Sequence, residues 1–398
     1  MTKFDQFARD VLQKVVESIE IPRSYYEAAT RRYKSLGDWF HRDESSIADD
    51  QPEVYPQGSF RLGTVTRPLN AECGYDLDLV CELRAVNKSQ GSQASLKKRV
   101  GVEVHAYAQA HGMKEPKEGR RCWKLLYTDK DGPSFHIDSL PAVPESEAKK
   151  SLIAQAIRRE DGIGPEVAAT AIAITCKTSP RYEQITDDWQ MSNPAGFAKW
   201  FEARMRLIAQ PRIEALLRDR VYAQVQDVPV YAWKTPLQIV VQLLKRHRDV
   251  MFADQPDIKP ISAIIATLAG RAYRDEGDLL DALANLVEQM PRLVSASKPR
   301  VPNPANPGED FADKWDAARE RAFFDWMDQV AVDVRELRRG MESERLRKFL
   351  RQRFGVDVGA GDRWLAAACA SIAETPVPAT PRTVNISSSS APRPWRDG

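Results

Sequence analysis

The sequence predicts an α+β fold in two parts, a small mixed sheet with helices followed by a helical region. Up to about residue 145, short stretches alternate polar and apolar residues as strands do, between helical stretches. Beyond Pro194 the apolar residues recur every three or four positions, as in helices. The length of 398 residues also exceeds what a single hydrophobic core usually serves, so we expect two domains.

The first part of the chain mixes helices and strands. Helical periodicity runs from Lys3 to about Phe40 and is interrupted at Pro22, because proline breaks or kinks a helix. A further helix is expected over Ser95–His111. The expected extended stretches are Val54–Phe60, Tyr75–Leu83, Trp123–Tyr127 and Ser134–Leu140.

The second part is predicted to be helical and to end in a tail. The expected helices span 196–218, 235–252, 260–273, 277–290 and 309–350. From about Thr375 the chain is dominated by Pro, Ser, Thr and Ala, which bury too little apolar surface to fold. We therefore expect a core with N-terminal helices at 1–190, a helical domain at 191–372 and a disordered tail at 373–398.

The composition of the chain argues against several classes of protein. Lys and Arg total 58 against 56 Asp and Glu, and this net charge of +2 argues against a protein that coats DNA or RNA. The scattered, odd-numbered cysteines suggest free thiols rather than disulfides or a zinc site. They are Cys73, Cys81, Cys122, Cys176 and Cys369. With no signal peptide and no apolar run of roughly 18 residues, the sequence predicts a cytoplasmic protein.

The first candidate motif is Gln57-Gly58-Ser59, at the end of an extended segment. A Gly-Ser turn lets backbone N–H groups and a hydroxyl approach phosphate oxygens, because glycine has no side chain in the way. Turns use both residues routinely, so an ordinary surface turn is the alternative.

The second motif is the pair Asp76 and Asp78 in the strand-like run YDLDLV. Residues two apart on a strand point to the same face, so the two carboxylates converge there. Like charges at such close range repel each other unless a cation lies between them. An exposed strand face carrying two acids is the alternative interpretation.

The third motif is Asp138, in the short alternating run FHID. Two-metal sites hold a pair of ions near the attacking and leaving oxygens, and a third acid on a neighbouring strand would complete the ligand set. Taken in this order, the three motifs predict two Mg²⁺ ions on Asp76, Asp78 and Asp138, with Mn²⁺ as the alternative metal. A strand-end acid before a turn is the other interpretation of Asp138.

With these residues, the chain resembles a known family. The runs QGSFRLGTVTRPL, YDLDLV and FHIDSLPAVP are similar to the bacterial, DncV-like cyclic-oligonucleotide synthases of anti-phage signalling. These enzymes are relatives of animal cyclic GMP-AMP synthase and of oligoadenylate synthase. The runs at 234–249, 259–269 and 303–315 also resemble the helical domain of that family, so the resemblance covers roughly residues 20 to 350.

The resemblance implies a polymerase-β-type nucleotidyltransferase core at 1–190, with the helical domain forming the other wall of a cleft. It implies synthesis of a cyclic di- or trinucleotide from ATP and/or GTP, with release of pyrophosphate and with an effector acting on the product. It also implies that Ser59 contacts the triphosphate and that Lys245 and Ser262 hold it from the helical side. From the residues alone, Lys245 is one cation on a basic helix and Ser262 could be a helix N-cap.

Other functions fit parts of the pattern. An RNA-tailing or CCA-adding enzyme, or an antibiotic adenylyltransferase, would share the acidic triad, and a catalytically inactive nucleotide-binding scaffold would share the fold. A tailing enzyme should carry a basic RNA-binding region, which the charge balance does not favour. The chain has no His/Cys cluster like the zinc insertion of the animal DNA sensor, so we expect activity without a long nucleic-acid activator.

The tail ends in Trp395-Arg396-Asp397-Gly398. A flexible tail with a terminal glycine can enter another enzyme's active site, because no side chain blocks the backbone near its carboxylate. In some systems of the resembled family the terminal glycine is joined to targets by a ubiquitin-activating-like enzyme. This suggests the hypothesis that Gly398 is a conjugation point; an unselected flexible terminus is the alternative.

Overall fold

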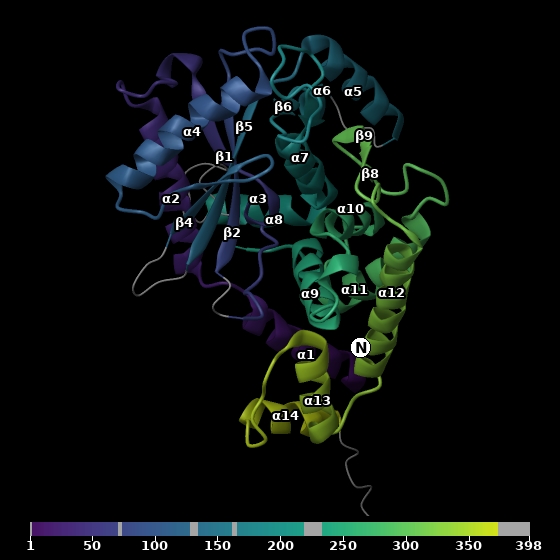
Figure 1. Ribbon diagram of the computed structural model, residues 1–398. Coiled ribbons are helices and arrows are strands. Elements are labelled where there is room, and N and C mark those ends of the chain that lie inside the picture. The colour runs from purple at the N-terminus through teal and green to yellow at the C-terminus, as the bar shows by residue number, and fades with distance from the viewer. Residues whose placement is uncertain (1, 71–73, 128–133, 161–164, 219–232, 373–398) are drawn as a thin grey trace, which may run out of the picture.

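The computed structural model describes residues 2–70, 74–127, 134–160, 165–218 and 233–372. A seven-stranded sheet lies on one side of the molecule and a group of helices on the other (Figure 1). The strands of the sheet are β1 Pro52–Pro56, β2 Tyr75–Leu83, β3 Lys117–Glu118, β4 Trp123–Tyr127, β5 Phe135–Pro144, β6 Ile172–Ile174 and β7 Gln190–Ser192.

The sheet is mixed, as predicted. Its order is β1-β2-β5-β4-β3, and β6 and β7 extend it beside the later part of β5. The central pair β2 and β5 is parallel, whereas every other described pair in this sheet is antiparallel. The α+β fold class is therefore confirmed, and the parallel pair places two strands of the predicted site directly beside each other.

One face of the sheet is covered by two helices, α2 Arg23–His41 and α4 Gln93–Ala110. Every second side chain of each strand points toward these helices, which explains why polar and apolar residues alternate along the strands. The buried residues that the strands contribute to this core include Leu77, Leu79, Phe135 and Ile137. The aspartates between them must point to the other face.

The helical half has its own core around α9 Pro236–Met251. The other helices of this half are α7 Pro194–Arg204, α8 Arg206–Arg218, α10 Ser262–Ala272, α11 Leu279–Gln289, α12 Ala317–Leu337, α13 Ser343–Phe354 and α14 Arg363–Ile372. The remaining elements are α3 Gly58–Leu62, α5 Glu147–Glu160, α6 Pro165–Ala168, the hairpin β8 Pro302–Asn303 and β9 Asn306–Asp310, and short 3₁₀ turns at Ala48–Asp50, Pro256–Ile258 and Met290–Leu293.

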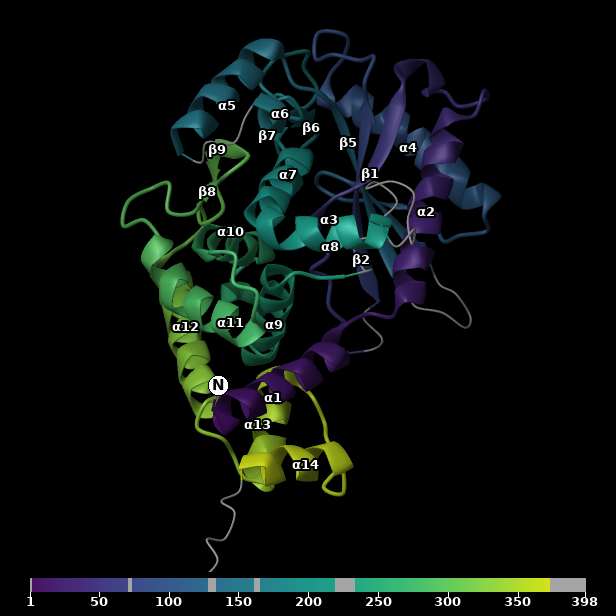
Figure 2. The same cartoon turned by 180° about the vertical axis from the view of Figure 1, so that it is seen from behind.

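The first helix, α1 Lys3–Ile19, packs with the helical half. Its apolar stripe, which includes Phe7, Val11 and Val15, shares a core with α9 and α11. Both views show α1 beside α13 and α14 (Figures 1 and 2). The sequence grouped this helix with the sheet, because an amphipathic stripe does not reveal which partner covers it.

The single helix predicted over 309–350 is wrong. Residues up to Asp310 form β9, and the helical stretch divides into α12 and α13 around Gly340. Gly340, in the connection between the two helices, has φ of +77°, a left-handed conformation that favours glycine. No helix among the described residues is long and apolar enough to span a membrane.

Two other predictions can be compared with the described residues only in part. Cys81, Cys122, Cys176 and Cys369 are free thiols, whereas Cys73 lies outside the described residues. The predicted tail at 373–398, with Gly398, also lies outside them.

Candidate active site

The three predicted acids lie on the central parallel strands. Asp78 on β2 is directly opposite Asp138 on β5, and Asp76 is opposite His136. Their neighbours Leu77 and Ile137 are buried in the core under α2 and α4, so the acids share the other face of the sheet. The predicted strand positions are confirmed, and the parallel register gives the pairing that the sequence could not supply.

The electrostatics of this face are unfavourable for three carboxylates. Burial, together with the nearby charges of Asp138 and Asp76, raises the pKa of Asp78 to about 6. Lys124 and Lys245 act in the opposite direction without cancelling these effects. A cation placed here would relieve the repulsion.

Lys124 and Cys122 are site residues that the sequence analysis missed. Lys124 on β4 is opposite Asp138 in the antiparallel pair, with its Nζ 3.2 Å from Asp138 Oδ2. The thiol of Cys122 donates to the same oxygen at 3.2 Å. Hydrogen bonding and charge from Asp138 raise the pKa of Lys124. The run WKLLY predicted a strand, but its register against β5 cannot be seen in sequence.

The Gly-Ser turn lies against the acids, although its local structure differs from the prediction. The extended stretch expected to reach Phe60 ends at Pro56, and Gly58 begins the short helix α3. Gly58 has φ of +62°, and a Cβ atom there would lie 2.8 Å from Asp78 Oδ2. The N–H of Gln57 donates to the carbonyl of Asp78 at 2.8 Å. Glycine is required because both the conformation and the space exclude a side chain.

The glycine turn thus lies directly beside aspartates on two paired parallel strands; the sequence predicted the three motifs, and the structure adds their arrangement. Residues 52–141, which contain all of these groups, match the family described as cyclic GMP-AMP synthase DncV-like, nucleotidyltransferase domain. This stretch is a DncV-like nucleotidyltransferase domain.

Two curated proteins that match most of the chain are named as synthases of cyclic dinucleotides. A c-di-GMP synthase of Roseivirga ehrenbergii is 25% identical over 357 residues, which are 87% of this chain and 84% of that protein. The cyclic dinucleotide synthase CdnG of Bradyrhizobium diazoefficiens is also 25% identical, over 87% of this chain and 80% of that protein.

Solved structures share the fold along most of the chain. The structure of Bradyrhizobium diazoefficiens CdnG in complex with GTP has a TM-score of 0.63 at 22% identity and covers 91% of this chain and 96% of that chain. Escherichia coli DncV in a 3′-deoxy GTP bound form has a TM-score of 0.52 at 16% identity and covers 90% and 89%. Both the nucleotidyltransferase domain and the helical half therefore follow a known arrangement.

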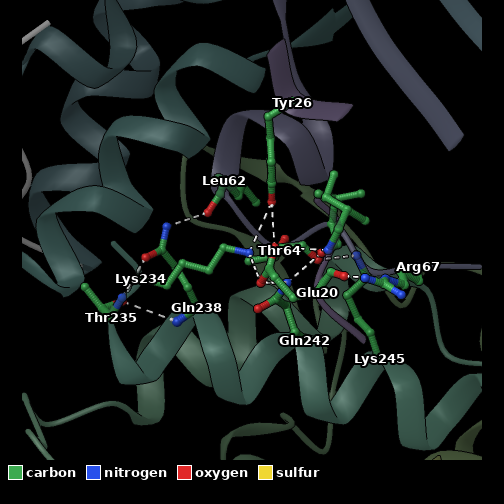
Figure 3. A network of polar contacts seen from close by, with 12 residues as sticks. Glu20, Tyr26, Leu62, Thr64, Arg67, Lys234, Thr235, Gln238, Gln242 and Lys245 are labelled. Carbon is green, nitrogen blue, oxygen red and sulfur yellow. Dashed lines mark hydrogen bonds and ion pairs between the residues drawn. The ribbon is translucent and has the colours of Figure 1, made fainter. Parts of the chain in front are cut away.

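Lys245 on α9 is buried and faces the nucleotidyltransferase domain (Figure 3). Its Nζ donates to the carbonyl of Thr64 at 2.8 Å. Burial and the charge of Arg248 lower its pKa to about 7, while Asp78 opposes this change. In this conformation the amine is bound to backbone, within the electrostatic reach of the acids.

Ser262 lies farther along the helical side, at the first turn of α10. Its hydroxyl accepts a hydrogen bond from Arg248 Nη1 at 3.0 Å, and the same nitrogen donates to the carbonyl of Pro260. The N-cap interpretation is wrong, because Ile261 occupies the cap and Ser262 is the first helical residue. The side chain is exposed and available to a ligand.

Asp76, Asp78 and Asp138 fit divalent cations by chemistry and placement. They are hard oxygen ligands on one face of two paired strands, and burial together with the charges of Asp138 and Asp76 raises the pKa of Asp78. Among the described residues, however, no three His, Cys, Asp or Glu side chains are gathered as a formed ligand cluster. This agrees with Asp138 turning to Lys124 and Cys122, which give its carboxylate other partners.

Proposed function

We propose that the protein is a nucleotidyltransferase that makes a cyclic dinucleotide and takes GTP as a substrate, with ATP as a second substrate to be tested. The observation that carries the proposal is Gly58 lying against Asp78, which is paired in register with Asp138. The names of the relatives, a c-di-GMP synthase and a cyclic dinucleotide synthase, support the product class. The GTP complex of CdnG supports the substrate.

In the proposed site, Asp76, Asp78 and Asp138 would hold two Mg²⁺ ions. When bound, such ions activate an attacking hydroxyl and stabilise the charge on the leaving pyrophosphate. The open backbone at Gly58 and the hydroxyl of Ser59 would bind the triphosphate, with Gln57 fixing the turn to β2 through its N–H. The attacking group is a ribose hydroxyl and the attacked atom is the α-phosphorus.

Lys245 and Ser262 would bind the triphosphate from the helical side. For Lys245 this requires the amine to leave the Thr64 carbonyl and take a proton, which an anionic phosphate favours. For Ser262 the hydroxyl is already exposed and is oriented by Arg248. The resemblance seen in sequence implies these roles. The position of Lys245 on α9 and of Ser262 at the start of α10 supports them.

Incubation of the protein with Mg²⁺ and labelled GTP and ATP, followed by separation of the products, tests the proposal. A cyclic product that needs the metal supports it. A nucleotide transferred to an RNA or small-molecule acceptor would instead identify another nucleotidyltransferase. Binding of nucleotide without turnover would identify an inactive scaffold.

The biological setting is also proposed. The resemblance suggests a role in anti-phage defence through an effector that binds the product. We further propose that Gly398 is joined to a target by a ubiquitin-activating-like enzyme. Co-expression with such enzymes should then give higher-mass adducts that disappear when Gly398 is deleted. The cytoplasmic location stays a prediction, supported by the free thiols of the described cysteines.

A further inference from the structure

Helix α9 carries a row of polar side chains that bind the end of α3 and the irregular stretch that follows it in the nucleotidyltransferase domain (Figure 3). The segment spans residues 62–67. Its carbonyl oxygens at Leu62, Thr64, Val65 and Arg67 accept from Gln238 Nε2 (2.9 Å), Lys245 Nζ (2.8 Å), Gln242 Nε2 (2.6 Å) and Arg246 Nη2 (2.5 Å), respectively. Helical spacing places these donors on one face of α9.

This segment continues directly from the glycine turn. The N–H of Thr64 donates to the carbonyl of Ser59 at 2.9 Å, and the N–H of Arg67 donates to the carbonyl of Ile19 at 2.8 Å. A continuous chain of contacts therefore runs from α9 through Thr64 to Ser59. Gly58, one residue earlier, is the group that lies against Asp78.

Gln242 is the most deeply buried member of the row, with none of its surface exposed. Its Nε2 donates to both the Val65 carbonyl and Glu20 Oε2, the latter at 3.2 Å. Glu20 also forms an ion pair with Lys234 at 2.5 Å. The amide thus ties the segment to the junction where α1 ends and α9 is about to begin.

The side-chain amide of Gln238 forms hydrogen bonds with two separate parts of the chain. Its Oε1 accepts from the N–H of Thr235 at 2.9 Å, which completes the capping box that starts α9. Its Nε2 is thereby left to donate to the Leu62 carbonyl. The start of the helix and the end of α3 are held by one amide group.

Burying an amide costs free energy unless its hydrogen bonds are made, so these positions are not explained by packing alone. Buried carbonyls of an irregular segment need donors, and side chains on a rigid helix supply them at fixed positions. Apolar residues would fill the same space without fixing how the segment sits along α9.

We propose that Gln238 and Gln242 are positioning residues that fix segment 62–67, and through it the Gly58-Ser59 turn, over the acidic face. The functional part of this inference rests on the proposed function. The structural part concerns the order of the turn itself and does not depend on which reaction the protein catalyses.

Two substitutions remove the side-chain hydrogen-bond donors of the row while keeping side chains of similar size. Gln238→Glu keeps an oxygen for the capping box but removes the donor to Leu62. Gln242→Met keeps the volume and removes both donated bonds. Asn285→Leu on α11 is the matched control, because it removes an amide that donates to the Ala272 carbonyl and to Glu276, neither of which belongs to segment 62–67.

Hydrogen–deuterium exchange of peptides covering residues 57–67 is the first measurement. We expect exchange there to accelerate roughly three- to tenfold in Gln238→Glu and Gln242→Met, matching the usual contribution of a hydrogen bond, and to stay unchanged in Asn285→Leu. Unchanged exchange over 57–67 in both folded variants would overturn the positioning role, whether or not product is made.

Steady-state kinetics with GTP and Mg²⁺ is the second measurement. We expect kcat/KM to fall about tenfold in both variants, mainly through KM, since a displaced turn would bind phosphate less well. Asn285→Leu should leave KM unchanged even if it lowers Tm as much as Gln238→Glu and Gln242→Met do. Faster exchange with an unchanged KM would overturn the link to the site. A wild-type protein that forms no product would overturn the proposed function alone, and exchange would still decide the positioning.

Discussion

Two aspartates, Asp333 with a buried side chain and Asp78 with a partly buried one, have opposite surroundings. Asp333 on α12 is 3% exposed and accepts from His247 Nε2 at 2.8 Å and Gln329 Nε2 at 3.0 Å. Arg353 pairs with it at 3.0 Å. Asp78 instead faces Asp138 and Asp76, and these like charges add to burial in raising its pKa.

We expect this difference to separate a structural carboxylate, Asp333, from one that binds a ligand, Asp78. The indole N–H of Trp326 donates to His247 Nδ1 at 3.1 Å, so Nε2 carries the proton given to Asp333, and every part of that network is satisfied. Such a network joins α9, α12 and α13. An acidic group held among other acids gains nothing for the fold, which is the condition expected where a ligand supplies the missing charge.

The largest expected effect is the loss of activity on replacing an acid of the sheet. Asp78→Asn should lower product formation by at least about 10³-fold, because metal-held charge stabilisation is worth several kcal/mol. Asp76→Asn should behave alike. Radiolabelled product formation at saturating Mg²⁺ measures this, and near wild-type turnover by either variant would refute the metal assignment.

The same variant should not lose stability. A carboxyl with a raised folded-state pKa favours folding while protonated, so metal-free wild type should lose stability as the pH rises from about 4 to about 6. Asp78→Asn should lack this loss and be the more stable protein at pH 7, by up to about 3 kcal/mol. Urea unfolding across this pH range in EDTA makes the comparison.

The second largest effect concerns Asp333. Asp333→Ala should destabilise the fold by about 3–5 kcal/mol, since it leaves His247 and Arg353 without their buried partner. Turnover by the molecules that remain folded should stay close to wild type. Urea unfolding and active-site-normalised rates are the two measurements. A stable but inactive variant would mean that the network belongs to the site and that the contrast with Asp78 fails.

The sequence predicted the strand positions of the acids well because strand alternation is a local property. Tyr75–Leu83 has the predicted bounds, and periodicity alone put Asp76 and Asp78 on one face. The same reasoning missed Lys124, since its approach to Asp138 depends on the register of β4 against β5. It also placed α1 with the wrong core and missed Gln238 and Gln242, whose partners are backbone carbonyls more than 170 residues away.

A smaller effect is expected at the glycine turn. Gly58→Ala must accommodate a Cβ 2.8 Å from Asp78 Oδ2 while keeping φ of +62°. The strain should cost about 1–2 kcal/mol and lower kcat/KM roughly tenfold. Gly112→Ala, where φ is +60° and nothing lies within 4 Å of the added carbon, is the matched control. It should lose similar stability and keep its kcat/KM; equal kinetics for both variants would remove the turn from the site.

The smallest effect is a proton taken up by Lys245 when nucleotide binds. Its pKa of about 7 leaves the free amine mostly neutral at pH 8. A triphosphate beside it favours the charged form, so its pKa should rise and binding should take up close to one proton at pH 8. At pH 6 the amine is already charged and the uptake should vanish. Calorimetry with a nonhydrolysable GTP analogue in Tris and in HEPES measures the uptake as a difference in observed enthalpy. Lys245→Met lacks the amine, so the proton uptake measured with this variant gives the background from the nucleotide, which is subtracted from the wild-type value. Equal uptake by wild type and Lys245→Met would mean that the amine stays on the Thr64 carbonyl, which would make Lys245 part of the polar row on α9 that binds segment 62–67 rather than a phosphate ligand.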